Sequence, residues 1–172
     1  MNDFPTFSIS DLADDMSRAG TDDYAHNPLY IGDLARIAAS ESARLLAGKT
    51  ILVTGAAGLI GTVIVDALME ANRQGAGIHV IALDREFVRS EIRLHRHFDS
   101  PLFSFIGQNV QNPLAEEISF DICIAAASNT SPLDYAAHPV ATALTNLLGA
   151  KNALDAARRC GGRLLFCSSV AR

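Results

Sequence analysis

The chain has 172 residues, of which 49% are hydrophobic and 19% are charged, as in an ordinary globular α/β protein with a single core. Its formal charge of −5 comes from residues 1–48, and because it lacks clustered Lys and Arg, both nucleic acids and anionic membranes are excluded as partners. No stretch approaches the ~20 apolar residues of a membrane span and the N-terminus is unlike a signal peptide, so we expect a cytoplasmic protein.

Residues 1–48 are predicted to form an acidic, partly helical N-terminal extension. This segment carries eight acidic and three basic side chains. Residues 1–28 are polar, and we expect them to be mobile or to lie over the domain. From about residue 29 to residue 46, apolar side chains recur at near-helical spacing, which predicts a helix that Gly48 ends.

A glycine-rich turn follows the first predicted strand, which covers residues 50–53. The turn reads Thr54-Gly55-Ala56-Ala57-Gly58-Leu59-Ile60-Gly61 and leads into a predicted helix over residues 59–72. Gly55 would allow the tight turn, Gly58 would let N–H groups approach a pyrophosphate, and Gly61 would let the helix pack closely on the sheet. A diphosphate would then lie at the helix N-terminus. No Gly-Lys-Ser/Thr follows, which excludes a P-loop, and a turn that binds nothing is the alternative.

The second predicted strand, over residues 79–83, leads into Asp84 at the distance expected of the acid in a dinucleotide-binding unit. A carboxylate that accepts two ribose hydroxyls makes charge-assisted bonds worth roughly 1.5–3 kcal/mol. A 2′-phosphate at 4 Å would instead meet repulsion of about 4 kcal/mol. Asp84 therefore favours NAD over NADP, although the neighbouring Arg85 could accommodate the phosphate.

The remaining segments continue to alternate between strand and helix. We expect helices over residues 86–98 and 139–159, and strands over residues 102–106, 120–125 and 163–167. Strands that alternate with helices predict right-handed crossovers. Residues 49–172 are thus expected to form an α/β domain of the Rossmann type, with a doubly wound parallel sheet of about five strands that ends after the fifth.

No metal site is predicted. The three cysteines, Cys123, Cys160 and Cys167, lack the spacing of metal ligands, and we expect them to be reduced and buried. His95 and His97 are two residues apart on a predicted helix, so their side chains point in different directions.

Three stretches of the chain carry a family resemblance. They are the turn over residues 54–61, the Ala-rich strand end and loop over residues 125–135 with the helix after it, and residues 166–169. Together they resemble the extended short-chain dehydrogenase/reductase family, and within it the nucleotide-sugar epimerase/dehydratase group. The middle stretch is similar to UDP-glucuronate decarboxylases and dTDP-glucose 4,6-dehydratases. The extension before the turn is similar to that of family members found with surface-polysaccharide genes.

The resemblance implies bound NAD, a nucleotide-sugar substrate and a set of residues around them. In the family, the turn holds the diphosphate, the acid binds the adenosine ribose, and the later positions flank the adenine and the nicotinamide side. The expected cofactor-binding residues are Gly55, Gly58, Leu59, Ile60, Gly61, Asp84, Arg85, Asn109, Val110, Ala125, Ala126 and Ala127. The family usually has Asp where Asn109 stands. Ser169 matches the catalytic hydroxyl that binds the sugar C4 hydroxyl, whereas Ser128, Ser131 and Ser168 fit local hydrogen bonding as well as ligand contact.

The catalytic Tyr-x-x-x-Lys pair of the family is missing from these residues, because none of Tyr24, Tyr30 and Tyr135 has Lys four positions later. Three interpretations follow. In the first, the chain is the cofactor half of a nucleotide-sugar enzyme, which binds NAD but turns over no substrate. In the second, it is a non-catalytic dinucleotide-binding or sensor module. In the third, it is an unstable truncation product with an unprotected edge strand. A homodimer is also expected.

Overall fold

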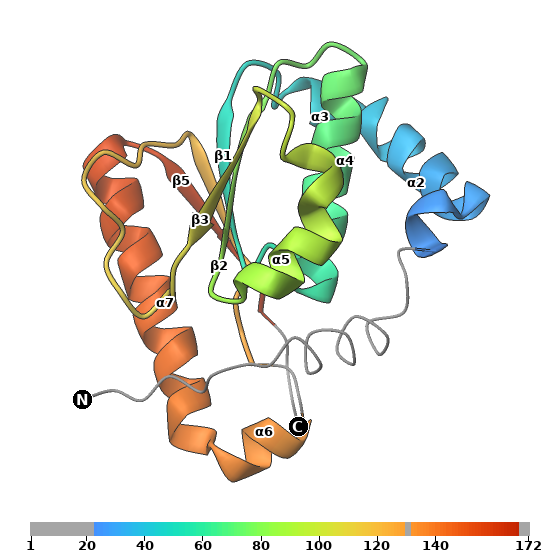
Figure 1. Cartoon of the computed structure of the whole chain (residues 1–172). Coiled ribbons are helices and arrows are strands. Elements are labelled where there is room, and N and C mark those ends of the chain that lie inside the picture. Colours follow the sequence, from blue (N-terminus) through green and yellow to red (C-terminus); the bar gives the residue numbers. More distant parts are fainter. Residues whose placement is uncertain (1–22, 130–131, 169–172) are drawn as a thin grey trace.

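The computed structural model describes residues 23–129 and 132–168. Five parallel strands form one sheet in the order β3-β2-β1-β4-β5 (Figure 1). They are β1 (Thr50–Thr54), β2 (His79–Asp84), β3 (Phe103–Gly107), β4 (Ile122–Ala125) and β5 (Arg163–Phe166). The predicted doubly wound parallel sheet is therefore confirmed, and the direction of strand order reverses between β1 and β4.

Helices cover both faces of the sheet (Figure 1). On one face lie α4 (Leu59–Arg73) and α5 (Phe87–Leu94), and on the other lies α7 (Pro139–Cys160). The helix α2 (Pro28–Ala38) of the N-terminal extension packs against α4. The shorter helices are η1 (Asp23–His26), α3 (Glu41–Arg44), η2 (His95–His97) and α6 (Pro132–Ala137). Within the described residues, no helix combines the length and the apolar character needed to cross a membrane.

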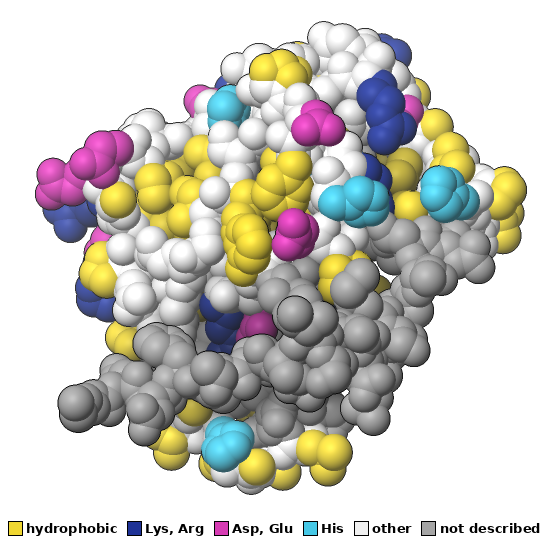
Figure 2. Space-filling view, in the orientation of Figure 1, with side chains coloured by type: hydrophobic (Ala, Val, Ile, Leu, Met, Phe, Trp, Pro, Cys, Tyr) yellow, Lys and Arg dark blue, Asp and Glu magenta, His cyan; other side chains and the backbone are white. Residues whose placement is uncertain are grey.

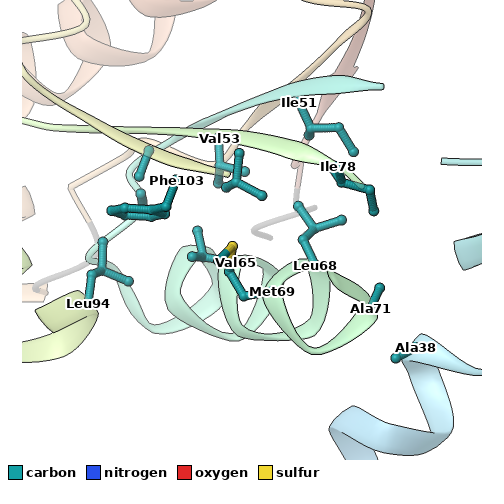
Figure 3. Packing of buried hydrophobic residues seen from close by; sticks show 13 residues of the cluster. Ala38, Ile51, Val53, Val65, Leu68, Met69, Ala71, Ile78, Leu94 and Phe103 are labelled. Carbon is teal, nitrogen blue, oxygen red and sulfur yellow. The ribbon is translucent and has the colours of Figure 1, made fainter. Parts of the chain in front are cut away.

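The core consists of two apolar layers, one on each face of the sheet. Residues Ile51 and Val53 of β1 point toward α4, where they meet Val65 and Leu68 (Figure 3). Leu52, between them, belongs to the layer under α7. This alternation follows from the two-residue period of a strand. All three β1 side chains are fully buried, and each such burial contributes about 1.5–3 kcal/mol.

A buried carboxylate connects the extension to the domain. Asp66 of α4 accepts hydrogen bonds from the Tyr30 hydroxyl at 2.5 Å and from His97 Nε2 at 2.7 Å, and it pairs with Arg96. Burial by itself would raise the pKa of Asp66. The hydrogen bonds from His97 and Tyr30 and the charge of Arg96 outweigh burial and hold that pKa below its usual value.

Three sequence-based expectations need correction. The single helix predicted over residues 29–46 is two helices, because the Ser40 side chain accepts a hydrogen bond from Ala43 N–H and starts a new helix. The helix predicted over residues 86–98 ends as an α-helix at Leu94 and continues as η2. Cys123 is buried, but Cys167 is exposed, since it follows a strand at the edge of the sheet.

Candidate cofactor site

A cleft of about 350 Å³ lies at the carboxyl ends of the strands, where the strand order reverses. This is the position at which open α/β sheets bind ligands. Eleven of the twelve residues expected to bind a cofactor line this cleft: Gly55, Gly58, Leu59, Ile60, Gly61, Asp84, Arg85, Asn109, Val110, Ala126 and Ala127. The fold thus brings together residues that are up to 72 positions apart in the chain.

The glycine turn leaves no room for side chains at two of its glycines. Gly55 has a φ of +68°, and a Cβ atom there would lie 2.7 Å from Ala127 Cα. A Cβ atom on Gly61 would lie 2.0 Å from the carbonyl oxygen of Gly55. The sequence interpretation assigned Gly61 to close helix–sheet packing. The structure places it against the turn itself, so Gly61 permits the tight exit from β1 into α4.

The start of α4 is open to an anion. Leu59, Ile60 and Gly61 form its first turn and line the cleft. The N–H groups of a first helical turn have no partner within the helix, and they lie at the positive end of the helix dipole. The N-cap residue Gly58 offers no capping side chain, and the first turn holds no acidic residue. This end of α4 can therefore accept the oxygens of a diphosphate.

Asp84 lies at the end of β2 and both lines the cleft and holds the turn. Its Oδ2 accepts a hydrogen bond from Ala57 N–H at 3.0 Å, and its Oδ1 accepts one from Glu86 N–H at 3.0 Å. A carboxylate has about four lone-pair positions, so it can still accept hydrogen bonds from two ligand hydroxyls. The sequence pattern indicated contact with ribose. It did not indicate the contact with Ala57, which depends on the packing of β2 beside the turn.

Two arginines line the same cleft as this carboxylate. Arg85 and Arg89 both line the cleft, as does Glu86. The Arg85 guanidinium pairs with Glu86, with Nε 3.3 Å from Oε1. Because both side chains are largely exposed, this pair contributes little to stability, but it places a second acidic group on this side of the cleft.

The segment after β3 also lines the cleft, and polar side chains of α7 hold it in place. Asn152 Nδ2 donates to the Val110 carbonyl at 2.9 Å, and Gln111 Nε2 donates to Thr145 Oγ1 at 2.9 Å. Arg159 donates to a carbonyl of the same segment. Thr145, Asn152 and Arg159 recur every seven residues and therefore share one face of α7. Sequence reasoning missed them, although their regular spacing on a largely apolar helix was a usable signal.

The remaining residues singled out in the sequence do not all lie in the cleft. Ala125 is buried within β4 and does not line the cleft. Ser169 and Ser131, together with residues 1–22, lie outside the described residues. Ser128, for which ligand contact and local bonding were both open, does line the cleft. The lining residues absent from the expected set are Glu86, Arg89, Gln108, Ser128, Asn129 and Thr145.

Comparisons with known proteins point to one family. The model of the NAD dependent epimerase/dehydratase family matches residues 51–172. UDP-glucuronic acid decarboxylase 6 of Arabidopsis thaliana is 38% identical over 119 residues, which are 69% of this chain and 33% of that protein. UDP-glucuronic acid decarboxylase 1 of Danio rerio is 34% identical over 121 residues, which are 70% of this chain and 27% of that protein. This chain spans about a quarter to a third of the length of the curated relatives that it matches.

Among solved structures, a similar one is a double mutant of DesIV, the dTDP-glucose 4,6-dehydratase from Streptomyces venezuelae, with NAD bound. It is 25% identical in sequence and superposes with a TM-score of 0.59. The match covers 66% of this chain and 37% of that protein.

Proposed function

Because the chain belongs to the NAD dependent epimerase/dehydratase family, we propose that residues 49–172 form the NAD-binding part of a nucleotide-sugar epimerase, dehydratase or decarboxylase. One observation carries this proposal: the open N-terminus of α4, the glycine turn and the Asp84 carboxylate all border one cleft. These are the groups that a diphosphate and a ribose require. Residues 1–48 are proposed to be a separate extension, of which α2 packs on α4.

The residues of the cleft have distinct proposed roles. The first turn of α4 would bind the diphosphate, Asp84 would accept the adenosine ribose hydroxyls, and Asn109 and Val110 would border the adenine. Ala126 and Ala127 would flank the nicotinamide side. When bound, NAD would supply a hydride acceptor for C4 of the sugar, so that the C4 hydroxyl becomes a ketone. Ser169 is proposed to bind that hydroxyl.

The isolated chain of 172 residues is expected to bind NAD without turning over a sugar nucleotide. None of its three tyrosines is followed four positions later by lysine, so it lacks the family's proton acceptor. Loss of a general base alone usually reduces a rate about 10²–10⁴-fold. Titration calorimetry with NAD and with NADP tests the binding, and NADH fluorescence after addition of UDP-glucuronate tests the oxidation of the sugar. NADH formation would contradict the expected inactivity, and absence of NAD binding would contradict the proposed cofactor role.

A second candidate function is a non-catalytic dinucleotide-binding or sensor module. This function is favoured because the cleft has the groups for a dinucleotide, while the 172 residues lack the Tyr-x-x-x-Lys pair. The gene sequence that follows codon 172 distinguishes the two functions. A Tyr-x-x-x-Lys motif encoded in frame after residue 172 would support the enzyme and argue against the sensor.

We also propose a homodimer formed through α7. Val140, Leu144, Leu147 and Leu154 are 70%, 41%, 69% and 55% exposed, respectively. Their spacing of four, three and seven residues forms one apolar stripe, of the kind that packs against another helix. Sedimentation equilibrium should give twice the monomer mass, and Leu147→Glu should restore the monomer. A monomeric wild-type protein would contradict this proposal.

The proposed setting is the cytoplasm, in the biosynthesis of a polysaccharide, with a nucleotide sugar as partner and without nucleic acid or membrane binding. Residues 49–172 carry equal numbers of acidic and basic side chains. On the face shown in Figure 2, the basic side chains of the described residues are dispersed among acidic and apolar ones. Such a distribution favours a small anionic ligand held by a few groups over a polyanion.

A further inference from the structure

One arginine outside the cleft contacts the glycine turn. Arg93 of α5 donates from Nη1 to the carbonyl oxygen of Ala57 at 2.8 Å, across 36 positions of the chain. Ala57 is fully buried, and Arg93 is half-buried. Arg93 does not line the cleft, so it contacts the turn from outside the ligand space.

With this contact, both backbone groups of Ala57 are held by charged side chains. The N–H group donates to the Asp84 carboxylate, and the carbonyl accepts from the Arg93 guanidinium. The preceding residue is also held, because Ala56 N–H donates to the Leu83 carbonyl at 3.2 Å. The apex of the turn is therefore fixed at three backbone groups of two consecutive residues.

The Ala57 carbonyl matters because it shares a peptide plane with the N–H group of Gly58. A peptide unit is planar, so fixing the carbonyl also fixes the direction of that N–H. Gly58 is the N-cap residue of α4, and its N–H donates to the Gly55 carbonyl at 2.9 Å. Arg93 thus determines how the turn enters the first turn of α4.

The position of Arg93 is itself fixed by a second contact between the same two segments. Directly after α5, His97 and Arg96 bind Asp66, which lies two helical turns after the start of α4. The segment over residues 87–97 is therefore attached to α4 at Asp66 and to the turn at Ala57. Movement of the α5 backbone at Arg93 away from the turn would therefore disturb a buried carboxylate cluster.

We propose that Arg93 is a positioning residue for the diphosphate-binding turn at the start of α4. This inference rests on the proposed cofactor function. It acts on the ligand through the Ala57–Gly58 peptide, and its positive charge has the sign that favours an anion at the turn. Its substitution should weaken ligands that carry a diphosphate and leave those without one unaffected.

The test uses the chain of 172 residues with ADP, adenosine and NAD as ligands. Arg93→Met removes the donor, Arg93→Lys keeps a charge and one donor, and Arg158→Met is the control at an exposed arginine of α7. Arg93→Met should raise the Kd for ADP and NAD by up to about tenfold, the limit reached when the ligand itself must order the turn that this charge-assisted hydrogen bond held. Adenosine binding, followed by NMR titration, should not change. Arg93→Lys should recover part of the ADP affinity, and the control should match wild type.

Each result decides between specific alternatives. An unchanged ADP affinity in Arg93→Met, or an equal loss for ADP and adenosine, would overturn the positioning role. If Arg93→Met does not fold, Arg93→Lys decides: weaker ADP binding at an unchanged unfolding midpoint supports the role, and unchanged binding overturns it. A wild-type chain that binds neither NAD nor ADP would instead overturn the proposed function, and this inference with it.

Discussion

Replacement of Gly61 by alanine should break the turn. The added methyl would lie 2.0 Å from the Gly55 carbonyl oxygen and 2.8 Å from Ala56 Cα, both of which are backbone atoms. Ordinary overpacking costs about 1–3 kcal/mol when side chains can yield. Here neither neighbour can rotate away, so Gly61→Ala should lower the free energy of unfolding by at least about 3 kcal/mol. It should also abolish NAD binding, because relief requires α4 to move away from the turn.

Gly32 provides a matched control within the same chain. It lies in the interior of α2 and is exposed, and a Cβ atom added there would have no heavy atom within 4 Å. Gly32→Ala should therefore stabilise the protein by about 0.5–1 kcal/mol through helix propensity. The same substitution is thus expected to change the free energy of unfolding in opposite directions at two helical glycines.

Urea unfolding followed by circular dichroism measures both variants, with the stability change taken from the midpoint at a constant slope. Titration calorimetry with NAD measures the binding. A Gly61→Ala protein as stable as wild type would refute the packing argument. A destabilised but folded variant with wild-type NAD affinity would refute the assignment of the cofactor to this turn.

Three further predictions follow from the same contacts. Asp84→Ala should weaken NAD binding more than tenfold in calorimetry, because each hydrogen bond to a charged group contributes about 1.5–3 kcal/mol; unchanged affinity would contradict its role. The pKa of Asp66 is lowered, so its stabilisation is complete above the ordinary carboxyl pKa and is lost as the pH falls through the folded-state value. In Asp66→Asn, the free energy of unfolding should accordingly depend less on pH in the acid range. An acid unfolding curve like that of the wild type would contradict the stabilising role of Asp66. Burial and, to a smaller extent, the nearby thiol of Cys160 raise the pKa of Cys123 to about 12. A thiol reagent at neutral pH should therefore label the exposed Cys167 but not Cys123 until the protein unfolds.

Much of the fold could be predicted because it depends on local patterns. The runs at residues 50–53 and 120–125 are strand-sized and apolar, and the glycine turn lies between a strand and a helix, so the parallel sheet and the family resemblance are both confirmed. Element ends were less predictable. The break between α2 and α3 depends on the Ser40 hydroxyl, which competes with the helix for a backbone N–H group in an otherwise helical pattern.

The cleft could be predicted in outline, since the glycine spacing and the acid of β2 form a recognised combination. What could not be predicted are contacts between segments far apart in the chain. The bond from Arg93 to Ala57 and the bond from Asn152 to Val110 span 36 and 42 positions, respectively. The seven-residue spacing on α7 indicated that Asn152 shares a face with Thr145 and Arg159. It could not identify the partner of Asn152, and no local signal identifies that of Arg93, because each partner is a backbone carbonyl, a group present at every residue.

The most direct test of the central claim is an NMR titration of the ¹⁵N-labelled chain with NAD. Binding at the cleft predicts saturable shifts of the amide signals of Leu59, Ile60 and Gly61 in the first turn of α4, and of Asp84 at the end of β2. The amides of α2, which lies outside the cleft, should keep their positions. Saturation with shifts elsewhere, or no shifts at all, would contradict the assignment of the glycine turn as the cofactor seat.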